Sequence, residues 1–113
     1  MLGSLHILKQ RKEFLACNSG ARKATPGFVL QGRDRRDQTE MIRVGFTCSK
    51  KLGNAVTRNR AKRRLRALAQ SLLPELAEPG WDYVLIGRPE ATVNRQFAEM
   101  EADLRRALTG LHR

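Results

Sequence analysis

The sequence predicts an α+β fold, a two-layer α-β sandwich whose elements follow the order α-β-β-α-β-α. Its 113 residues suffice for one compact core and are too few for two, so residues 1–113 are predicted to form a single domain. A hydrophobic fraction of 41% excludes a disordered basic tail. Apolar residues cluster or alternate in short runs between turn signals and recur every three to four residues in longer segments, which predicts strands and helices respectively.

The first half of the chain is predicted to hold one helix followed by two strands. Residues 9–18 form the helix, which ends at a Ser-Gly pair. Residues 28–30 form the first strand, and residues 41–48 form the second, with apolar side chains at alternate positions. The polar segment between them, residues 33–40, is predicted to be an exposed turn, so the two strands are expected to pair as an antiparallel hairpin.

The second half is predicted to hold two helices that flank the most hydrophobic strand. The first of these helices spans residues 56–73 and ends before Pro74. Its apolar side chains recur along one side and predict a buried stripe of Ala61, Leu65, Leu68 and Leu72. Residues 81–87 form the strand, and Thr92 or Asn94 is expected to cap a final helix that ends near Leu111.

The positive charge is concentrated in one segment. Lysine and arginine number 22 against 11 aspartates and glutamates, which gives a formal net charge of +11. Residues 50–66 hold eight of these cations and no acidic residue, so the i, i+4 ion pairs typical of a solvated helix face are absent there. A folded domain with such a segment is expected to bind a polyanion, and arginines on a rigid helix favour the phosphates of folded RNA.

Other classes of function are not favoured by the residue pattern. Hydrolysis by the chain itself would need converging carboxylates or a nucleophile beside a base, and neither stands out, so no catalytic residue is predicted. Cys17 and Cys48 lack metal-ligand spacing, so no metal site is predicted and both thiols are expected to be free. No run is apolar enough for a membrane span or a signal peptide, which indicates a cytoplasmic protein.

The segment SKKLGNAVTRNRAKRRLR, residues 49–66, resembles the signature of the bacterial ribonuclease P protein subunit, the RNR-motif family. These proteins assist a catalytic RNA that removes 5′ leaders from precursor tRNA. The resemblance extends to length, charge and element order, and it implies a left-handed β-α-β crossover around the signature helix. It also assigns RNA binding to a set of residues in this chain: Lys50, Lys51, Asn54, Arg58, Asn59, Arg60, Lys62, Arg63, Arg64 and Arg66.

The same resemblance implies the partners and the division of labour. The expected partners are the ribonuclease P catalytic RNA and precursor tRNA, and the free chain is expected to be a monomer that binds no membrane. Catalysis is expected from the RNA, with Mg²⁺ in the holoenzyme held mainly by RNA and no cofactor bound tightly by this chain. The chain would then be the protein component of an endoribonuclease. The alternative is a ribosomal-type protein that binds structured RNA without nuclease association.

A second RNA contact is implied by the family's cleft between the first helix and the sheet, which contacts the single-stranded leader. Phe14 matches the aromatic position on the helix, and the outward side of the first strand is expected to present Val29 and Gln31. Asn18 and Gln31 occupy positions that can be aromatic in the family. Because each stacked base contributes roughly 1–3 kcal/mol, the leader contact is expected to be weaker or more polar here.

Overall fold

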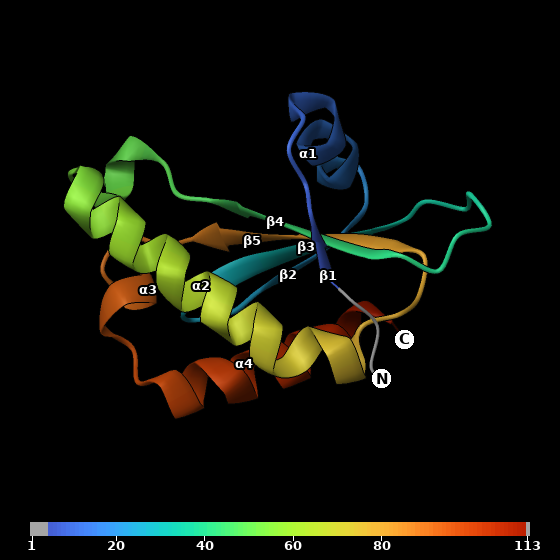
Figure 1. Ribbon diagram of the computed structural model, residues 1–113. Helices are drawn as coiled ribbons and strands as arrows, with labels where there is room; N and C mark the ends of the chain where they lie inside the picture. Colours follow the sequence, from blue (N-terminus) through green and yellow to red (C-terminus); the bar gives the residue numbers. More distant parts are fainter. Residues whose placement is uncertain (1–4, 113) are drawn as a thin grey trace.

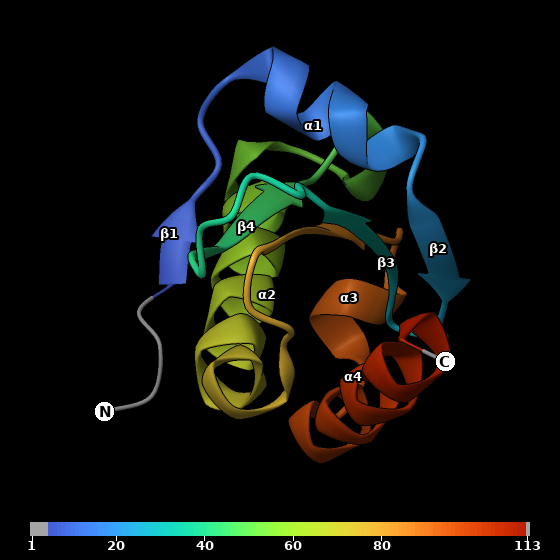
Figure 2. The same ribbon diagram turned by 90° about the vertical axis from the view of Figure 1, so that its right-hand side faces the viewer.

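The computed structural model describes residues 5–112, which form one five-stranded sheet with helices on both faces (Figures 1 and 2). The strands are β1 (Leu5–Ile7), β2 (Ala21–Ala24), β3 (Phe28–Asp34), β4 (Ile42–Thr47) and β5 (Trp81–Gly87). The helices are α1 (Arg11–Asn18), α2 (Ala55–Leu76), α3 (Ala91–Asn94) and α4 (Phe97–Leu111), with a 3₁₀ turn, η1 (Lys50–Leu52), before α2. The predicted α+β sandwich is confirmed: in Figure 1, α2, α3 and α4 lie below the sheet and α1 lies above it.

The order of the strands differs from the sequence-based expectation. It is β1-β4-β5-β3-β2, so the predicted hairpin of β3 and β4 is wrong. β5 lies between these two strands, antiparallel to β3 and parallel to β4. The central place suits β5 because helices cover both faces of the sheet there, and residues 82–85 are buried. β1 and β2, which were not predicted, are short strands that pair along the two edges.

The β4, α2 and β5 elements form a β-α-β unit of neighbouring parallel strands. Taken together, the two perpendicular views show that its crossover is left-handed, as the resemblance implied (Figures 1 and 2). At the end of this unit, Gly87 lies against Leu52 and Cys48. The unit therefore brings the turn before α2 next to the carboxyl ends of β4 and β5.

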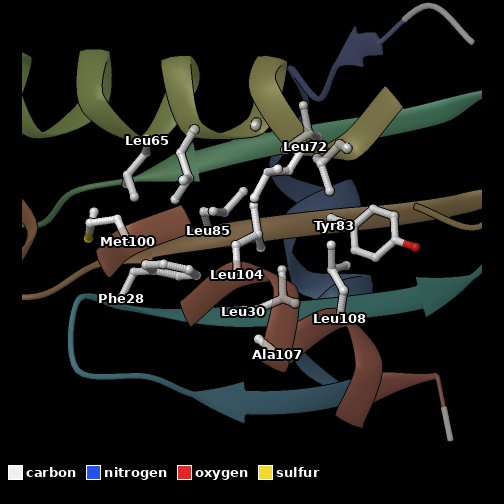
Figure 3. Close-up of a cluster of buried hydrophobic side chains, with 14 of the residues drawn as sticks. Phe28, Leu30, Leu65, Leu72, Tyr83, Leu85, Met100, Leu104, Ala107 and Leu108 are labelled. Atoms are coloured by element: carbon white, nitrogen blue, oxygen red, sulfur yellow. The ribbon is translucent and has the colours of Figure 1, made fainter. Parts of the chain in front are cut away.

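The main core lies between the sheet and the helices α2 and α4 (Figure 3). The predicted stripe of α2 is confirmed, because all four of its residues are buried: Ala61, Leu65, Leu68 and Leu72. The three leucines of this stripe pack with side chains of the sheet and of α4 that include Phe28, Leu30, Leu85, Met100, Leu104 and Leu108. At about 2 kcal/mol for each fully buried large apolar side chain, this stripe determines which side of α2 faces the sheet.

The predicted end of the long helix is wrong by one turn. α2 continues through Pro74 to Leu76. A proline near the C-terminus of a helix removes one backbone hydrogen bond, and the helix survives that loss when the neighbouring bonds remain. The Ala77 amide still donates to the Leu73 carbonyl at 3.0 Å.

The predicted caps of the last helix are also wrong. α4 starts after Gln96 without a side-chain cap, and Asn94 is the last residue of the separate α3. Thr92 is buried inside α3. Its hydroxyl accepts a hydrogen bond from the Arg88 amide (2.7 Å) and donates one to the Gly27 carbonyl (2.6 Å). Thr92 therefore ties α3 to two strand ends of the sheet.

A smaller core lies on the opposite face of the sheet, under α1. Leu8, Cys17 and Val84 are buried there, and Phe14 packs against them half-buried. The Phe14 ring lies over Gly45, where a Cβ would approach two ring carbons to 2.4 and 2.6 Å. A glycine is therefore needed for α1 to approach the sheet this closely. Burial raises the pKa of the Cys17 thiol to about 11, so this free cysteine stays protonated at neutral pH.

Candidate RNA-binding surface

The turn before α2 is shaped by short-range contacts. The Ser49 hydroxyl accepts a hydrogen bond from the Lys51 amide at 3.3 Å and begins η1. Gly53 adopts φ = 132°, a conformation that favours glycine. The Asn54 side-chain oxygen caps α2 by accepting from the Thr57 amide at 2.9 Å. Because this oxygen already accepts the capping hydrogen bond, Asn54 would have to contact RNA through its side-chain amide nitrogen.

One surface of η1 and α2 collects most of the predicted RNA-binding residues. We call it the basic face and define it as Lys50, Lys51, Asn59, Arg60, Lys62, Arg63 and Arg66. All of these residues are exposed except Lys62, which is partly buried. Within residues 5–112, none of their cations forms an ion pair. Four of them line a shallow hollow of about 420 Å³, namely Asn59, Lys62, Arg63 and Arg66. The basic face thus presents free donors around a concave surface.

Arg64 lies on a different side of α2 from the basic face. Its guanidinium donates to the Arg95 carbonyl and lies 5.9 Å from the centre of the Phe97 ring. These contacts connect α2 to α3 and α4, so Arg64 has a role in the fold that the sequence did not reveal. The Arg66 guanidinium also lies 5.9 Å from an aromatic ring, that of Phe46, but it remains exposed.

The acidic residues that form ion pairs within residues 5–112 all pair with arginines outside the basic face. Two fully buried carboxylates, Asp82 and Asp103, take part in four of the ion pairs formed within residues 5–112. Asp82 binds Arg35 and Arg43, and Asp103 binds Arg95 and Arg106. A buried carboxylate needs such charged partners, because an unpaired buried charge is costly.

Arg35 contradicts the prediction that residues 33–40 form an exposed turn. Its side chain is only 4% exposed. It donates to Asp82 at 2.7 Å, to the Trp81 carbonyl at 3.1 Å and to the Met41 carbonyl at 2.7 Å. These long-range partners were not visible in the sequence, and they fasten the loop between β3 and β4 to the sheet.

Arg43 connects α1 to the central strands. Its guanidinium donates two hydrogen bonds to Asp82, at 2.7 and 2.6 Å, and one to Glu13 of α1 at 2.6 Å. Hydrogen bonding to Asp82 raises the pKa of Arg43. The pKa of Glu13 is lowered mainly by the hydrogen bond that its carboxylate accepts from the Gln10 backbone amide, and Arg43 lowers this pKa further. Both groups therefore stay charged at neutral pH and hold the start of α1 against β4.

The predicted leader-cleft residues lie on the α1 side of the sheet but differ in accessibility. Phe14 is half-buried, whereas Val29 and Gln31 are only 6% and 4% exposed because α1 packs against β3. The expectation that the strand presents these two side chains outward is therefore wrong. Val29 and Gln31 instead form the buried base of the surface beside α1. An open hollow of about 510 Å³ lies beside them and is lined by Gln10, Lys12, Glu13, Ala16, Arg33 and Arg43.

The cations of this hollow were missed in the sequence analysis. Arg33 follows Val29 and Gln31 at strand spacing, so alternation along β3 could have placed it on the same face. Arg43 could not have been placed in this way, because its position depends on the parallel pairing of β4 with β5.

Comparisons of sequence identify the family. A family model described as Ribonuclease P matches residues 2–112. The chain belongs to this family. The ribonuclease P protein component of Ruegeria pomeroyi is 52% identical over 109 residues, which cover 96% of this chain and 87% of the relative. That of Gluconacetobacter diazotrophicus is 48% identical over 109 residues, covering 96% and 92% respectively. Membership of the ribonuclease P family does not favour the ribosomal-type alternative.

Solved structures of ribonuclease P proteins share the fold. The protein of Staphylococcus aureus superposes with a TM-score of 0.74 at 26% identity, covering 92% of this chain and 93% of that one. The protein of Thermotoga maritima gives a TM-score of 0.74 at 24% identity, covering 94% of each chain, and supports the fold alone.

Two further findings concern the part of the chain that the structure describes. Residues 5–112 contain no group of three or more histidine, cysteine, aspartate or glutamate side chains that could hold a metal ion. None of their helices combines the length and apolar character needed to cross a membrane.

Substitution of Asp82 by asparagine should destabilise the fold strongly. The change leaves the guanidiniums of Arg35 and Arg43 without their shared carboxylate, and breaking a buried ion pair costs about 3–5 kcal/mol. Urea unfolding measures the loss. Glu75→Gln is the control, because Glu75 is exposed and makes no ion pair within residues 5–112, and it should change stability by less than about 0.5 kcal/mol. A loss below about 1 kcal/mol for Asp82→Asn would contradict this role.

Proposed function

We propose that this chain is the RNA-binding subunit of ribonuclease P. In this role residues 1–113 act as one domain that binds the catalytic RNA and the 5′ leader of precursor tRNA, and so assists removal of the leader. The observation that carries the proposal is the basic face, whose cations lie on η1 and α2, are exposed except for the partly buried Lys62, and are unpaired with any acidic residue of the described chain. The basic face lies within residues 2–112, which match the Ribonuclease P family model, and this supports RNA as the polyanion.

The basic face binds the catalytic RNA by neutralising its phosphates. The planar guanidinium of arginine can donate two parallel hydrogen bonds to one phosphate, and the hollow at Asn59, Arg63 and Arg66 gives these donors a concave arrangement. If the face meets about six phosphates, the logarithm of affinity should fall with the logarithm of salt with a slope of roughly −4 to −5. Neutralisation lets the RNA and its substrate assemble at lower ionic strength.

The cleft beside α1 holds the leader. Phe14 is half-buried and leaves part of its aromatic ring accessible to a base, above the buried Val29 and Gln31. Lys12 and Arg33 line the adjoining hollow and supply charge for the leader's backbone. Because mature tRNA lacks the leader, this contact favours the precursor by differential binding.

Cleavage itself belongs to the RNA in this proposal. Mg²⁺ in the holoenzyme is held mainly by RNA and supplies the charge stabilisation of phosphodiester hydrolysis. The chain contributes binding and orientation, and no residue of it is assigned a catalytic role. We further propose that the free protein is a monomer and that the complex works in the cytoplasm.

Replacing Arg60 and Arg63 by alanine should weaken binding to a bacterial ribonuclease P RNA by about 10- to 100-fold while leaving the fold intact. Both side chains are exposed, and neither forms a side-chain hydrogen bond or an ion pair within residues 5–112. Filter binding over a salt series should show a slope that is smaller by roughly 1.4–1.8. The control is Arg36→Asn with Arg105→Ala, which removes the same charge elsewhere. Equal losses in both double variants would show that net charge alone matters, and unchanged affinity of the first would contradict the proposal.

Replacing Phe14 by alanine should reduce affinity for precursor tRNA by about 5- to 100-fold and leave affinity for mature tRNA nearly unchanged, because a stacking contact with the leader is lost. Phe14 also packs on Leu8 and Val84, so Phe14→Leu serves as the control that preserves apolar packing without an aromatic ring. Leucine should lose most of the same discrimination. Equal losses for precursor and mature tRNA in the holoenzyme would remove Phe14 from leader binding.

A further inference from the structure

Two segments of the chain besides residues 50–66 contain arginines and no acidic residue, namely residues 14–33 and residues 104–113. The first includes the edge strand β2, and the second includes the C-terminal half of α4. Figure 2 shows β2 running from the end of α1 to the C-terminal end of α4. The fold therefore brings these two segments together at one edge of the sheet.

The edge strand β2 carries one cation on each face of the sheet. Arg22 is paired with Gln31 of β3, and residues directly opposite each other in an antiparallel pair point to the same face, so Arg22 lies on the α1 face. Lys23 is paired with Leu30, a residue of the main core, so it lies on the face covered by α4. Both side chains are exposed, and neither forms an ion pair within residues 5–112.

Arg22 adjoins the open hollow beside α1. Arg33 lines that hollow and lies two residues beyond Gln31 on β3, so Arg22 and Arg33 are diagonal neighbours across the strand pair. Side chains in such positions begin about 7–8 Å apart. A single-stranded RNA in the hollow can therefore continue onto β2 without leaving the positive charge.

Lys23 extends the row of cations to α4. Lys23 and Arg106 line the same hollow of about 170 Å³ at the end of this helix. The Lys23 side chain lies against Gly110, where a Cβ would be only 2.9 Å from the Lys23 Cε. The two acid-free segments thus contribute one cation each to a shared concave surface.

Arg106 is positioned by a buried carboxylate. Its guanidinium donates to Asp103 at 2.7 Å, yet the Arg106 side chain is 67% exposed. Asp103 also lines the hollow, but it accepts two hydrogen bonds from Arg95 as well, at 2.8 and 3.2 Å, so two guanidiniums offset its charge. A donor that is held in place before binding loses less conformational freedom when a ligand arrives, so Arg106 is suited to recognition.

We propose that Arg22, Lys23 and Arg106 form a path for the 5′ leader beyond the cleft. A long leader crosses the edge of the sheet at β2 and reaches the end of α4. The inference rests on the proposed function, which places the leader beside α1. RNA is the occupant that the charge favours, because each cation can neutralise one backbone phosphate and the path continues directly from the leader cleft. Within residues 5–112 no strand pairs with the outer side of β2, so the edge is open for the crossing.

Leader length tests the path. Precursor tRNAs with leaders of about 4 to about 16 nucleotides, the size range of single-strand binding sites, are titrated with the holoenzyme assembled from this chain and a bacterial ribonuclease P RNA. The Lys23→Gln holoenzyme should bind the shortest leader with parental affinity and the longest leader about 3- to 10-fold more weakly. Its salt slope for the longest leader should fall by roughly 0.7. Parental affinity for the shortest leader also shows that the variant is folded.

The order in which two variants take effect tests the direction of the path. Arg22→Gln should weaken binding at shorter leader lengths than Lys23→Gln does, because Arg22 adjoins the cleft and Lys23 lies across the edge. Lys23→Arg retains the charge and should bind every leader with parental affinity. Arg36→Asn is the control, because it removes one charge from an exposed position whose φ of 54° asparagine tolerates. It should change affinity by less than about twofold at any length.

Three outcomes overturn the proposal. Parental affinity of Lys23→Gln for the longest leader would exclude the path. A loss of the same size at every leader length would show an effect of net charge, and onset of both variants at the same length would contradict a crossing from one face to the other. Phe14→Ala is measured in the same series. If it still weakens precursor binding, only this inference fails; if it also has no effect, the leader contact of the proposed function fails as well.

Discussion

The structure depends on how a small number of carboxylates is shared among twice as many cations. The chain has 11 acidic residues against 22 lysines and arginines. Its two fully buried acids, Asp82 and Asp103, are committed to arginines that hold loops and helices in place. The cations of the basic face have no acidic partner within residues 5–112. Part of the excess positive charge is thereby gathered, without acidic partners, on η1 and α2, where a polyanion can meet it.

Folding and RNA recognition are linked through α2. The apolar stripe that includes Leu65 and Leu68 fixes the rotation of the helix against the sheet, and this rotation turns Arg60, Arg63 and Arg66 outward. The crossover then brings the start of α2 beside the ends of β4 and β5 (Figure 1). The same packing that stabilises the protein thus sets the spacing of these outward arginines, and no rearrangement of the helix is required for them to face a ligand.

Features that depend on local sequence patterns were predicted correctly, whereas pairings between distant segments of the chain were not. The 3.6-residue period of α2 sufficed to predict its buried stripe, because that stripe depends only on residues within the helix. The pairing of β3 with β5 instead of β4 could not be inferred, since alternation along a strand does not name its neighbour. For the same reason the burial of Arg35 against Asp82 and the inward turn of Arg64 to Phe97 could not be predicted.

The most direct measurement is reconstitution of cleavage from purified components. A bacterial ribonuclease P RNA is incubated with labelled precursor tRNA over a magnesium titration, with and without the chain, and release of the 5′ leader is followed. The chain should shift cleavage to lower magnesium concentrations and should release no leader when the RNA is omitted. Cleavage by the chain alone, or identical magnesium curves with and without it, would contradict the proposal that the unpaired arginines bind an RNA that performs the cleavage.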